Sequence, residues 1–186
     1  MRLIGGQWRR SKLPVADRPG LRPTPDRVRE TLYNWLGQDL QGWRVLDAFA
    51  GSGALGFEAA SRGASQVLLL ESDRQLVASL RASQTRLGAT QLRIEQADAL
   101  AWMRTAPAAS FDLVLLDPPY AADLFEAALA AAVPLLHEGG LIYLEADRPF
   151  DDAALAAAGL RVRRSGRAGQ VHFHLLERRP AGLASA

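Results

Sequence analysis

Short runs of valine, leucine and isoleucine alternate with segments of helical spacing through the middle of this chain, and this alternation constrains the fold most. The strand-like runs are residues 44–49, 66–71, 92–96, 111–117 and 141–145. Nearly continuous apolar strands joined by helices are typical of a parallel sheet that is covered on both faces. We therefore predict an α/β fold, in one domain of about 150 residues with an appendage.

The segments between these strands carry the signals of amphipathic helices. The clearest one has Leu76, Leu80 and Leu87 on one stripe and Gly88 placed to end it. Helices are predicted to begin near residues 54, 74, 98 and 123.

One more helix is predicted before the first strand. Thr24 can cap it, Pro25 suits the first helical position, and apolar residues recur at helical spacing until Gly37. Residues 1–23 lack such periodicity and are dense in glycine, proline and arginine. We expect them to form an extended arm or a short hairpin.

The end of the chain has a different pattern. Residues 160–165, a turn from Gly166 to Gly169 and residues 170–177 resemble a hairpin, so the last strand should be antiparallel to the others. The predicted organisation is a basic N-terminal arm over residues 1–23, a single domain over residues 24–179 and a tail over residues 180–186.

Composition excludes several classes of protein. With no cysteine, the chain has no disulfide framework, no thiol nucleophile and no cysteine-type zinc site. The N-terminal residues contain too few consecutive apolar side chains for a signal peptide. The longest apolar run, residues 127–136, is shorter than the roughly 20 residues that a membrane span needs. His172 and His174 share one face of the last strand without a nearby acid, so we read them as structural and expect no metal. We expect a cytoplasmic, monomeric protein without membrane contact.

Charge is distributed unevenly along the chain, although the formal net charge is only +2. Residues 1–30 carry a net +5, residues 31–158 a net −8 and residues 159–186 a net +5. Two basic ends around an acidic middle suggest that the ends face a polyanion. The alternative is that arginine-rich ends are simply well solvated.

Three glycines follow the first predicted strand. Gly51, Gly53 and Gly56 have the spacing G-x-G-x-x-G between a strand and a helix, which permits a tight turn and a close approach of the backbone to a ligand. This pattern alone also fits a nicotinamide cofactor, or glycines that serve packing only.

Acidic residues near the strand ends narrow the choice of ligand. Glu71 ends the second strand twenty residues after Gly51, where an acid can accept both hydroxyls of a ribose. Asp47 would repel a diphosphate but suits the ammonium group of an amino-acid tail. Asp98 follows the third strand, where it can accept the amino group of adenine, cap the next helix, or do both.

The fourth strand ends in Asp117-Pro118-Pro119-Tyr120. The prolines fix the backbone and remove two donors, so that the Pro118 carbonyl and the Asp117 carboxylate can both accept from one incoming NH2 group. These two acceptors favour a pyramidal nitrogen whose lone pair can attack a sulfonium methyl group. Tyr120 offers a flat face on which a base can stack, and an ordinary turn rarely combines these features.

The order LDAFAGSGALG, LLES, AD and DPPY resembles the class I S-adenosylmethionine-dependent methyltransferases of the amino-methylating branch. More narrowly, RLIGGQWRRSKLP, GLRPTPDRVRETLYNWL and AGQVHFHLLER resemble the bacterial guanine-N2 methyltransferases of 16S rRNA. The resemblance implies a Rossmann-like sheet of seven mostly parallel strands in the order 3-2-1-4-5-7-6, with helices on both faces. It also implies methyl transfer to one guanine of an assembled or partly assembled small ribosomal subunit.

The resemblance assigns roles to residues that match the family motifs. Those expected to bind S-adenosylmethionine are Asp47, Phe49, Gly51, Ser52, Gly53, Glu71, Asp98 and Ala99. Those expected to act in catalysis are Asp117, Pro118, Pro119 and Tyr120.

The basic N-terminal segment then acquires an expected role in gripping 16S rRNA. Trp8 can contact an unstacked base, or it can pack the arm onto the body. The arginines at 161, 163, 164 and 167 either extend this surface or are solvated edge charges. The residues expected to bind RNA are Gln7, Trp8, Arg9, Arg10, Lys12, Arg22, Arg27 and Arg29.

Other functions remain as alternatives. Methylation of adenine N6 in DNA uses a related motif, but no insertion or C-terminal segment provides room for a target-recognition domain. A noncatalytic RNA-binding assembly protein and a nicotinamide-dependent oxidoreductase are two further classes, and a protein substrate fits the basic arm poorly.

Overall fold

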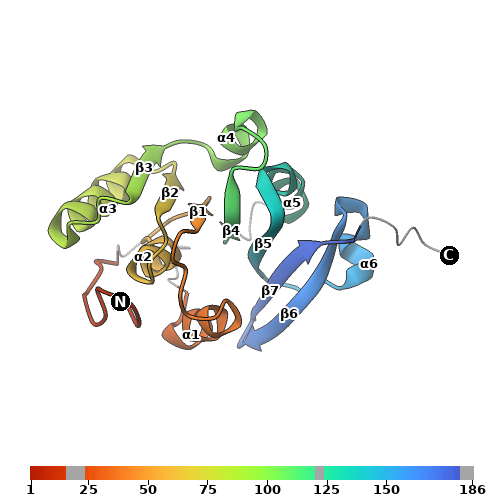
Figure 1. The fold of residues 1–186 in the computed structure, drawn as a ribbon, viewed down its shortest axis with the longest axis horizontal. Helices are drawn as coiled ribbons and strands as arrows, with labels where there is room; N and C mark the ends of the chain where they lie inside the picture. Colours follow the sequence, from red (N-terminus) through yellow and green to blue (C-terminus); the bar gives the residue numbers. More distant parts are fainter. Residues whose placement is uncertain (16–23, 120–123, 181–186) are drawn as a thin grey trace.

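The computed structural model describes residues 1–15, 24–119 and 124–180, and within them the strands form one seven-stranded sheet (Figure 1). Its order is β3-β2-β1-β4-β5-β7-β6, with β7 antiparallel to β5 and β6 and the other pairs parallel. The predicted α/β class, the strand order and the antiparallel last strand are therefore confirmed. The strands are β1 (Arg44–Asp47), β2 (Gln66–Glu71), β3 (Leu92–Gln96), β4 (Phe111–Leu116), β5 (Leu136–Ala146), β6 (Leu160–Ala168) and β7 (Val171–Arg178).

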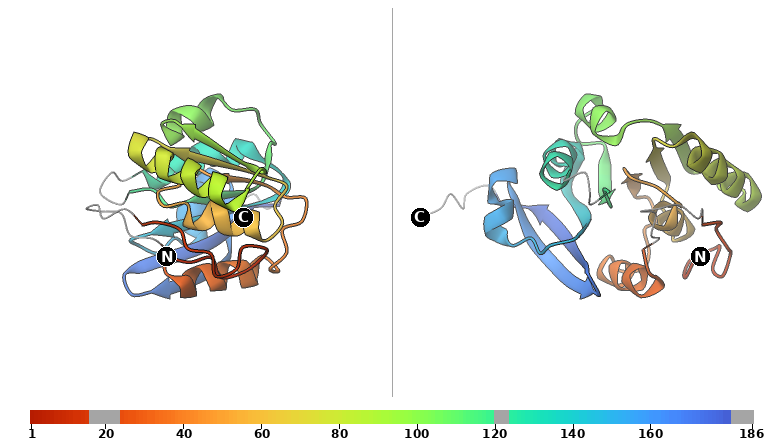
Figure 2. Two further views of the ribbon diagram at one scale, coloured as in Figure 1. Left: turned by 90° about the vertical axis from the view of Figure 1, so that its left-hand side faces the viewer. Right: turned by 180° about the vertical axis from the view of Figure 1, so that it is seen from behind.

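Helices cover both faces of the sheet (Figure 1, Figure 2). Apolar side chains of α1, α2 and α3 share one buried cluster with the sheet, and those of α4, α5 and α6 share the other. These two clusters are the core expected for strands that are apolar on both sides. The helices are α1 (Asp26–Trp35), α2 (Ala54–Ser61), α3 (Arg74–Leu87), α4 (Ala99–Thr105), α5 (Phe125–Ala132) and α6 (Asp152–Leu155), with 3-10 turns at Val133–Leu135 and Ala156–Ala158.

Two predicted helix ends have different outcomes. Helix α3 ends at Gly88, whose φ of 60° is left-handed, as predicted. The predicted cap of α1 by Thr24 is wrong, because Pro25 occupies the capping position and the Thr24 hydroxyl donates instead to Glu145 Oε1 at 2.7 Å. Thr24 thus ties the start of α1 to the carboxyl end of β5.

The β6–β7 hairpin is longer than its sequence pattern suggested. Gly166 lies inside β6 and not in the turn, which follows Ala168. A Cβ at Gly166 would lie only 2.4 Å from Cζ of Phe173 on the paired strand, so glycine here makes room for an aromatic ring.

Residues 1–13 fold back as a short hairpin, which was one of the two predicted forms. The backbones of Arg2 and Lys12 form an antiparallel β-bridge, and the Leu3 N–H donates to Ser11 O at 2.9 Å. Leu3 and Leu13 are buried in the α1–α3 cluster, and the hairpin lies beside α2 (Figure 1, Figure 2). The hairpin is therefore part of the core. Among the described residues, no helix is long and apolar enough to cross a membrane.

Candidate active site

The turn after β1 contains two glycines in the left-handed backbone conformation. Gly51 and Gly53 have φ values of 53° and 80°, which favour glycine. A Cβ on Gly53 would lie 2.7 Å from side-chain atoms of Leu80 and Phe57. Both the conformation and the packing therefore require glycine at position 53.

Glu71, at the end of β2, reaches across to this turn. Its Oε2 accepts from the Gly51 N–H at 2.9 Å, and its Oε1 accepts from the Asp73 N–H at 2.8 Å. Glu71 is half-buried, so the carboxylate is fixed in orientation but still borders solvent. The structure thus brings together two residues that the sequence placed twenty positions apart.

Asp47 lies beneath the turn and is only 1% exposed. Its Oδ2 accepts from the Gly56 N–H at 2.8 Å, which fixes the first turn of α2 against β1. Burial raises the pKa of Asp47 to about 7, and the Gly56 hydrogen bond opposes this increase. Contact between Asp47 and an ammonium group stays a prediction.

The other predicted cofactor residues line the same edge of the sheet. Asp98 caps α4, with its Oδ1 accepting from the Ala101 N–H at 2.7 Å, and it remains exposed. Ala99 begins α4 and is buried, and Phe49 is half-buried against the α4–α6 cluster. Ser52 is half-buried, with its Oγ 3.9 Å from Sδ of Met1 in the hairpin.

Asp117 follows β4 directly, in the centre of the sheet. The side chain of Asp117 is half-buried, Pro118 is buried and Pro119 is exposed. Burial raises the pKa of Asp117 well above its usual range, and the negative charges of Glu145 and Asp47 raise it further. Tyr120 lies outside the described residues.

Glu145 is a candidate site residue that the sequence reasoning missed. It stands near the end of β5 with 3% exposure, and its Oε1 accepts from the Thr24 hydroxyl at 2.7 Å and the Tyr143 hydroxyl at 3.0 Å. Burial raises its pKa. The available signal was an acid at the carboxyl end of the strand that follows the Asp117 strand.

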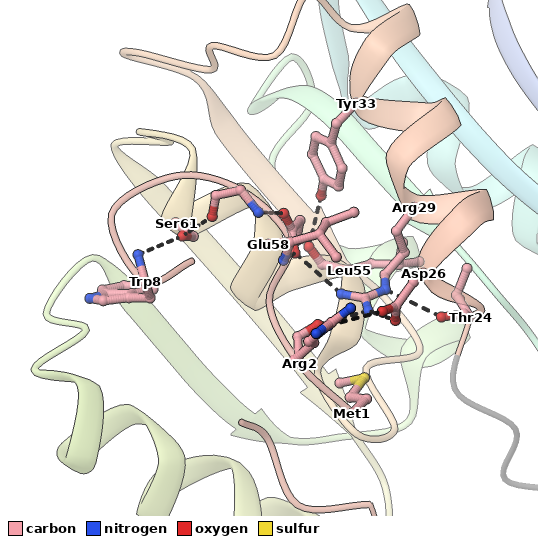
Figure 3. A network of polar contacts seen from close by, with 12 residues as sticks. Met1, Arg2, Trp8, Thr24, Asp26, Arg29, Tyr33, Leu55, Glu58 and Ser61 are labelled. Atoms are coloured by element: carbon pink, nitrogen blue, oxygen red, sulfur yellow. Dashed lines mark hydrogen bonds and ion pairs between the residues drawn. The ribbon is translucent and has the colours of Figure 1, made fainter. Parts of the chain in front are cut away.

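The prediction that Arg29 contacts RNA is wrong, because Arg29 is fully buried. Figure 3 shows the polar contacts that hold it. Its guanidinium donates to Asp26 Oδ1 at 2.6 Å, to Glu58 Oε2 at 3.2 Å and to two backbone carbonyls. Glu58 is also fully buried and accepts from the Ile4 and Gly5 N–H groups at 2.9 and 2.8 Å. Arg29 therefore holds the hairpin and α1 against α2.

The other residues expected to bind RNA, where the structure describes them, lie at the surface, with Trp8 half-buried. A hollow of about 270 Å³ between the hairpin and α1 is lined by Arg2, Arg9 and Arg10 together with Asp26 and Glu30. Trp8 is half-buried against the core, and its backbone N–H donates to Ser61 Oγ at 2.9 Å (Figure 3). Of the residues predicted to bind RNA, Arg22 lies outside the described residues. The predicted RNA-binding residues that are exposed are Gln7, Arg9, Arg10, Lys12 and Arg27.

The described residues contain no group of three or more histidines and acids that could hold a metal ion. A larger hollow, of about 580 Å³, lies at the opposite edge of the sheet, where Gln38, Gln41 and Gln91 precede the strands. We place the candidate site at the carboxyl ends of β1, β2, β4 and β5, because the polar residues described above lie there and have the chemistry to bind a ligand. This is the edge at which open parallel sheets bind ligands.

The sheet order and these strand-end residues together define a class I methyltransferase fold. A solved structure described as putative methyltransferase yhhF from Escherichia coli superposes with a TM-score of 0.83 and 36% identity, covering 96% of this chain and 98% of that one. A hypothetical protein of Thermus thermophilus gives a TM-score of 0.79 and 31% identity, covering 95% and 99%.

The family described as Conserved hypothetical protein 95 matches residues 1–177, and the chain belongs to this family. It is 39% identical over 192 residues to "Ribosomal RNA small subunit methyltransferase D" of Escherichia coli K12, covering 100% of this chain and 94% of that protein. The protein of the same name from Haemophilus influenzae is 41% identical over 155 residues, covering 80% and 79%.

Proposed function

We propose that the protein transfers a methyl group from S-adenosylmethionine to the exocyclic N2 amine of a guanine in 16S rRNA of the small ribosomal subunit. The observation that carries this proposal is the position of Asp117 and Pro118 at the end of β4, the strand next to β1 and its glycine turn. The names of the relatives in E. coli and H. influenzae support ribosomal RNA as the substrate.

The residues at the ends of β1 and β2 fit S-adenosylmethionine. Because Gly51 and Gly53 have no side chains, a ligand can approach the backbone of the turn closely. The carboxylate of Glu71 is fixed by its hydrogen bond to the turn and retains lone pairs that can accept from ribose hydroxyls. Asp98 is exposed beside α4 and can accept an adenine amino group while it caps the helix. When bound, this cofactor supplies an electrophilic methyl group.

Asp117 and Pro118 supply the acceptors that the amine needs. A guanine amine is a poor nucleophile because its lone pair is delocalised into the ring. Hydrogen bonds from its two N–H groups to the Asp117 carboxylate and the Pro118 carbonyl favour a pyramidal nitrogen. Its lone pair would form the new N–C bond as the bond between sulfur and the methyl group breaks, with the electron pair of that bond staying on sulfur. The raised pKa of Asp117 suits its carboxylate to receive the proton that the nitrogen loses.

The exposed basic residues of the hairpin and α1 support RNA as the partner. Arg9, Arg10, Lys12 and Arg27 are positioned to contact phosphates, and Gln7 and Trp8 are candidates for an unpaired base. A target base must leave its stack to reach Asp117, which costs a few kcal/mol and least in a loop.

The test is methylation of small ribosomal subunits from a strain that lacks this protein. With S-adenosylmethionine labelled in the methyl group, we expect one labelled nucleoside per subunit, N2-methylguanosine, after complete digestion and mass analysis. Naked 16S rRNA run in parallel reports the assembly stage of the substrate. Label in adenosine, label in protein, or no label would overturn the proposal.

Asp117→Ala should abolish turnover, by at least about 100-fold, because the amine loses an acceptor in the transition state. Binding of S-adenosylhomocysteine, measured by calorimetry, should stay within a few-fold of wild type. Asp112→Ala is a matched control at the opposite end of β4, where Asp112 accepts from the Arg44 N–H. Loss of cofactor binding in Asp117→Ala would show that this carboxylate does not act on the amine alone.

A further inference from the structure

Glu145 stands beside Asp117 at the same edge of the sheet. Strands β4 and β5 are parallel, with Leu115 opposite Tyr143 and Leu116 opposite Leu144, so Asp117 and Glu145 follow as the next pair in register. Neighbouring parallel strands lie about 4.8 Å apart, and paired residues project from the same face. Two carboxylates are thus adjacent where the base amine is proposed to bind.

The side chain of Glu145 is fixed through one of its oxygens. Both the Thr24 and the Tyr143 hydroxyls donate to Oε1, and no described residue donates to Oε2. Tyr143 is fully buried, and Thr24 is 5% exposed. Within residues 1–15, 24–119 and 124–180, two donors therefore hold one oxygen of Glu145, and none holds the other.

The negative charge of Glu145 is not needed for these contacts. A glutamine amide oxygen could accept the same two hydrogen bonds without repelling Asp117. Among the described residues, neither Glu145 nor Asp117 forms an ion pair, and the negative charge of Glu145 raises the cost of ionising Asp117. The charge of Arg29 favours ionisation of Glu145 but only opposes the larger effect of burial. A costly charge next to the reacting position points to a role in binding.

Base edges differ in what they present beside the reacting amine. Guanine places the N1–H donor next to the N2 amine, whereas adenine places the N1 acceptor next to its N6 amine and cytosine places the N3 acceptor next to its N4 amine. A second acceptor beside Asp117 matches the guanine edge and opposes the other two.

We propose that Glu145 determines the base specificity of the site: its Oε2 accepts the N1–H of the guanine whose N2 amine Asp117 holds, and its charge repels a lone pair at the same position. This inference rests on the proposed function, and it concerns which base is accepted, not whether methyl transfer occurs.

The test compares guanine with 2-aminopurine, which keeps the reacting amine but has an acceptor at N1. Small subunits are reconstituted with 16S rRNA carrying either base at the guanine that the labelling experiment identifies. We expect wild type to prefer guanine by about 10-fold to 100-fold in kcat/KM, because 2-aminopurine leaves Oε2 facing a lone pair. Glu145→Gln should reduce this preference to a few-fold, because the amide NH2 then takes the place of Oε2 and can donate to N1 of 2-aminopurine.

Two further variants make the result decisive. Glu138→Gln changes an exposed glutamate at the other end of β5 and should keep the wild-type ratio. Tyr143→Phe removes one donor to Oε1 and should weaken the preference for guanine in part, which provides a second measurement if Glu145→Gln does not fold.

The outcomes separate this inference from the proposed function. If wild type does not methylate guanine N2, the proposed function fails. If wild type methylates guanine but has no preference over 2-aminopurine, the role of Glu145 is refuted. It is also refuted if folded Glu145→Gln, or Tyr143→Phe in its place, keeps the wild-type ratio.

Discussion

At the scale of single residues, Asp47 and Gly56 form one unit. The Gly56 N–H donates to Asp47 Oδ2, and a Cβ on Gly56 would lie 2.9 Å from that same oxygen. The third glycine of the motif therefore serves the approach of α2 to β1. Asp47 accepts this contact at the cost of burying a carboxyl group whose pKa rises to about 7.

Asp47→Asn should make stability less dependent on pH. The carboxyl has a pKa of about 7 when folded and about 3.9 when unfolded, so the folded state binds its proton more tightly between these values. In the wild type, binding of this proton stabilises the folded state. This contribution to the free energy of unfolding is fully present below pH 4 and is lost as the pH rises to 7. Relative to wild type, the variant should gain on the order of 1–4 kcal/mol between pH 4.5 and pH 8 in urea unfolding.

A control for this experiment is Asp39→Asn, which changes an exposed aspartate. Its stability should run parallel to wild type across the same range. Parallel curves for Asp47→Asn would show that Asp47 titrates alike in the folded and unfolded chains.

At the scale of elements, the sequence pattern predicted those strands and helix ends that depend only on residues close together in the sequence. The strands β2 and β3 and the end of α3 at Gly88 follow from apolar spacing and turn residues within a few positions. The burial of Arg29 depends on Glu58, 29 positions away, and the placing of Glu145 depends on Thr24, 121 positions away. Such contacts exist only once the strand order is known, so periodicity does not reveal them.

The sequence of the N-terminal hairpin shows no periodicity that would predict its fold. The hairpin is held in place by two buried leucines, Leu3 and Leu13, and by the buried carboxylate of Glu58. Glu58→Gln should lower the free energy of unfolding by about 3–5 kcal/mol, since buried Arg62 would lose its charged partner and Arg29 would keep only the half-exposed Asp26. Glu126→Gln is the comparison, because Glu126 pairs with Arg148 at the surface and should change stability by less than about 1 kcal/mol. Similar losses in urea unfolding for both variants would contradict this account.

At the scale of the whole molecule, the two basic ends differ. Arg161 and Arg163 both pair with Glu177, so part of the C-terminal charge is neutralised within the β6–β7 hairpin. In the N-terminal segment, Arg9 and Arg10 line a shared hollow. The sequence sum treated these ends as equal, because charge counts contain no information on pairing.

Arg9→Ala combined with Arg10→Ala should therefore reduce the salt dependence of small-subunit binding. Each lost phosphate contact should lower the slope of log affinity against log salt by roughly 0.7 to 0.9, so the pair should change it by about 1.4 to 1.8. Arg163→Ala is the control and should leave the slope nearly unchanged. Equal changes in both would place RNA on the β6–β7 hairpin as well.

The attachment of the hairpin to α2 also sets an order of events during synthesis. Ile4 and Gly5 bind Glu58 across 54 and 53 positions, and Trp8 binds Ser61 across 53. The hairpin leaves the ribosome before α2 does, and a lone two-stranded hairpin is marginal in water. A nascent chain released before Ser61 should leave this segment open to proteases, and protection should begin only after α2 has emerged.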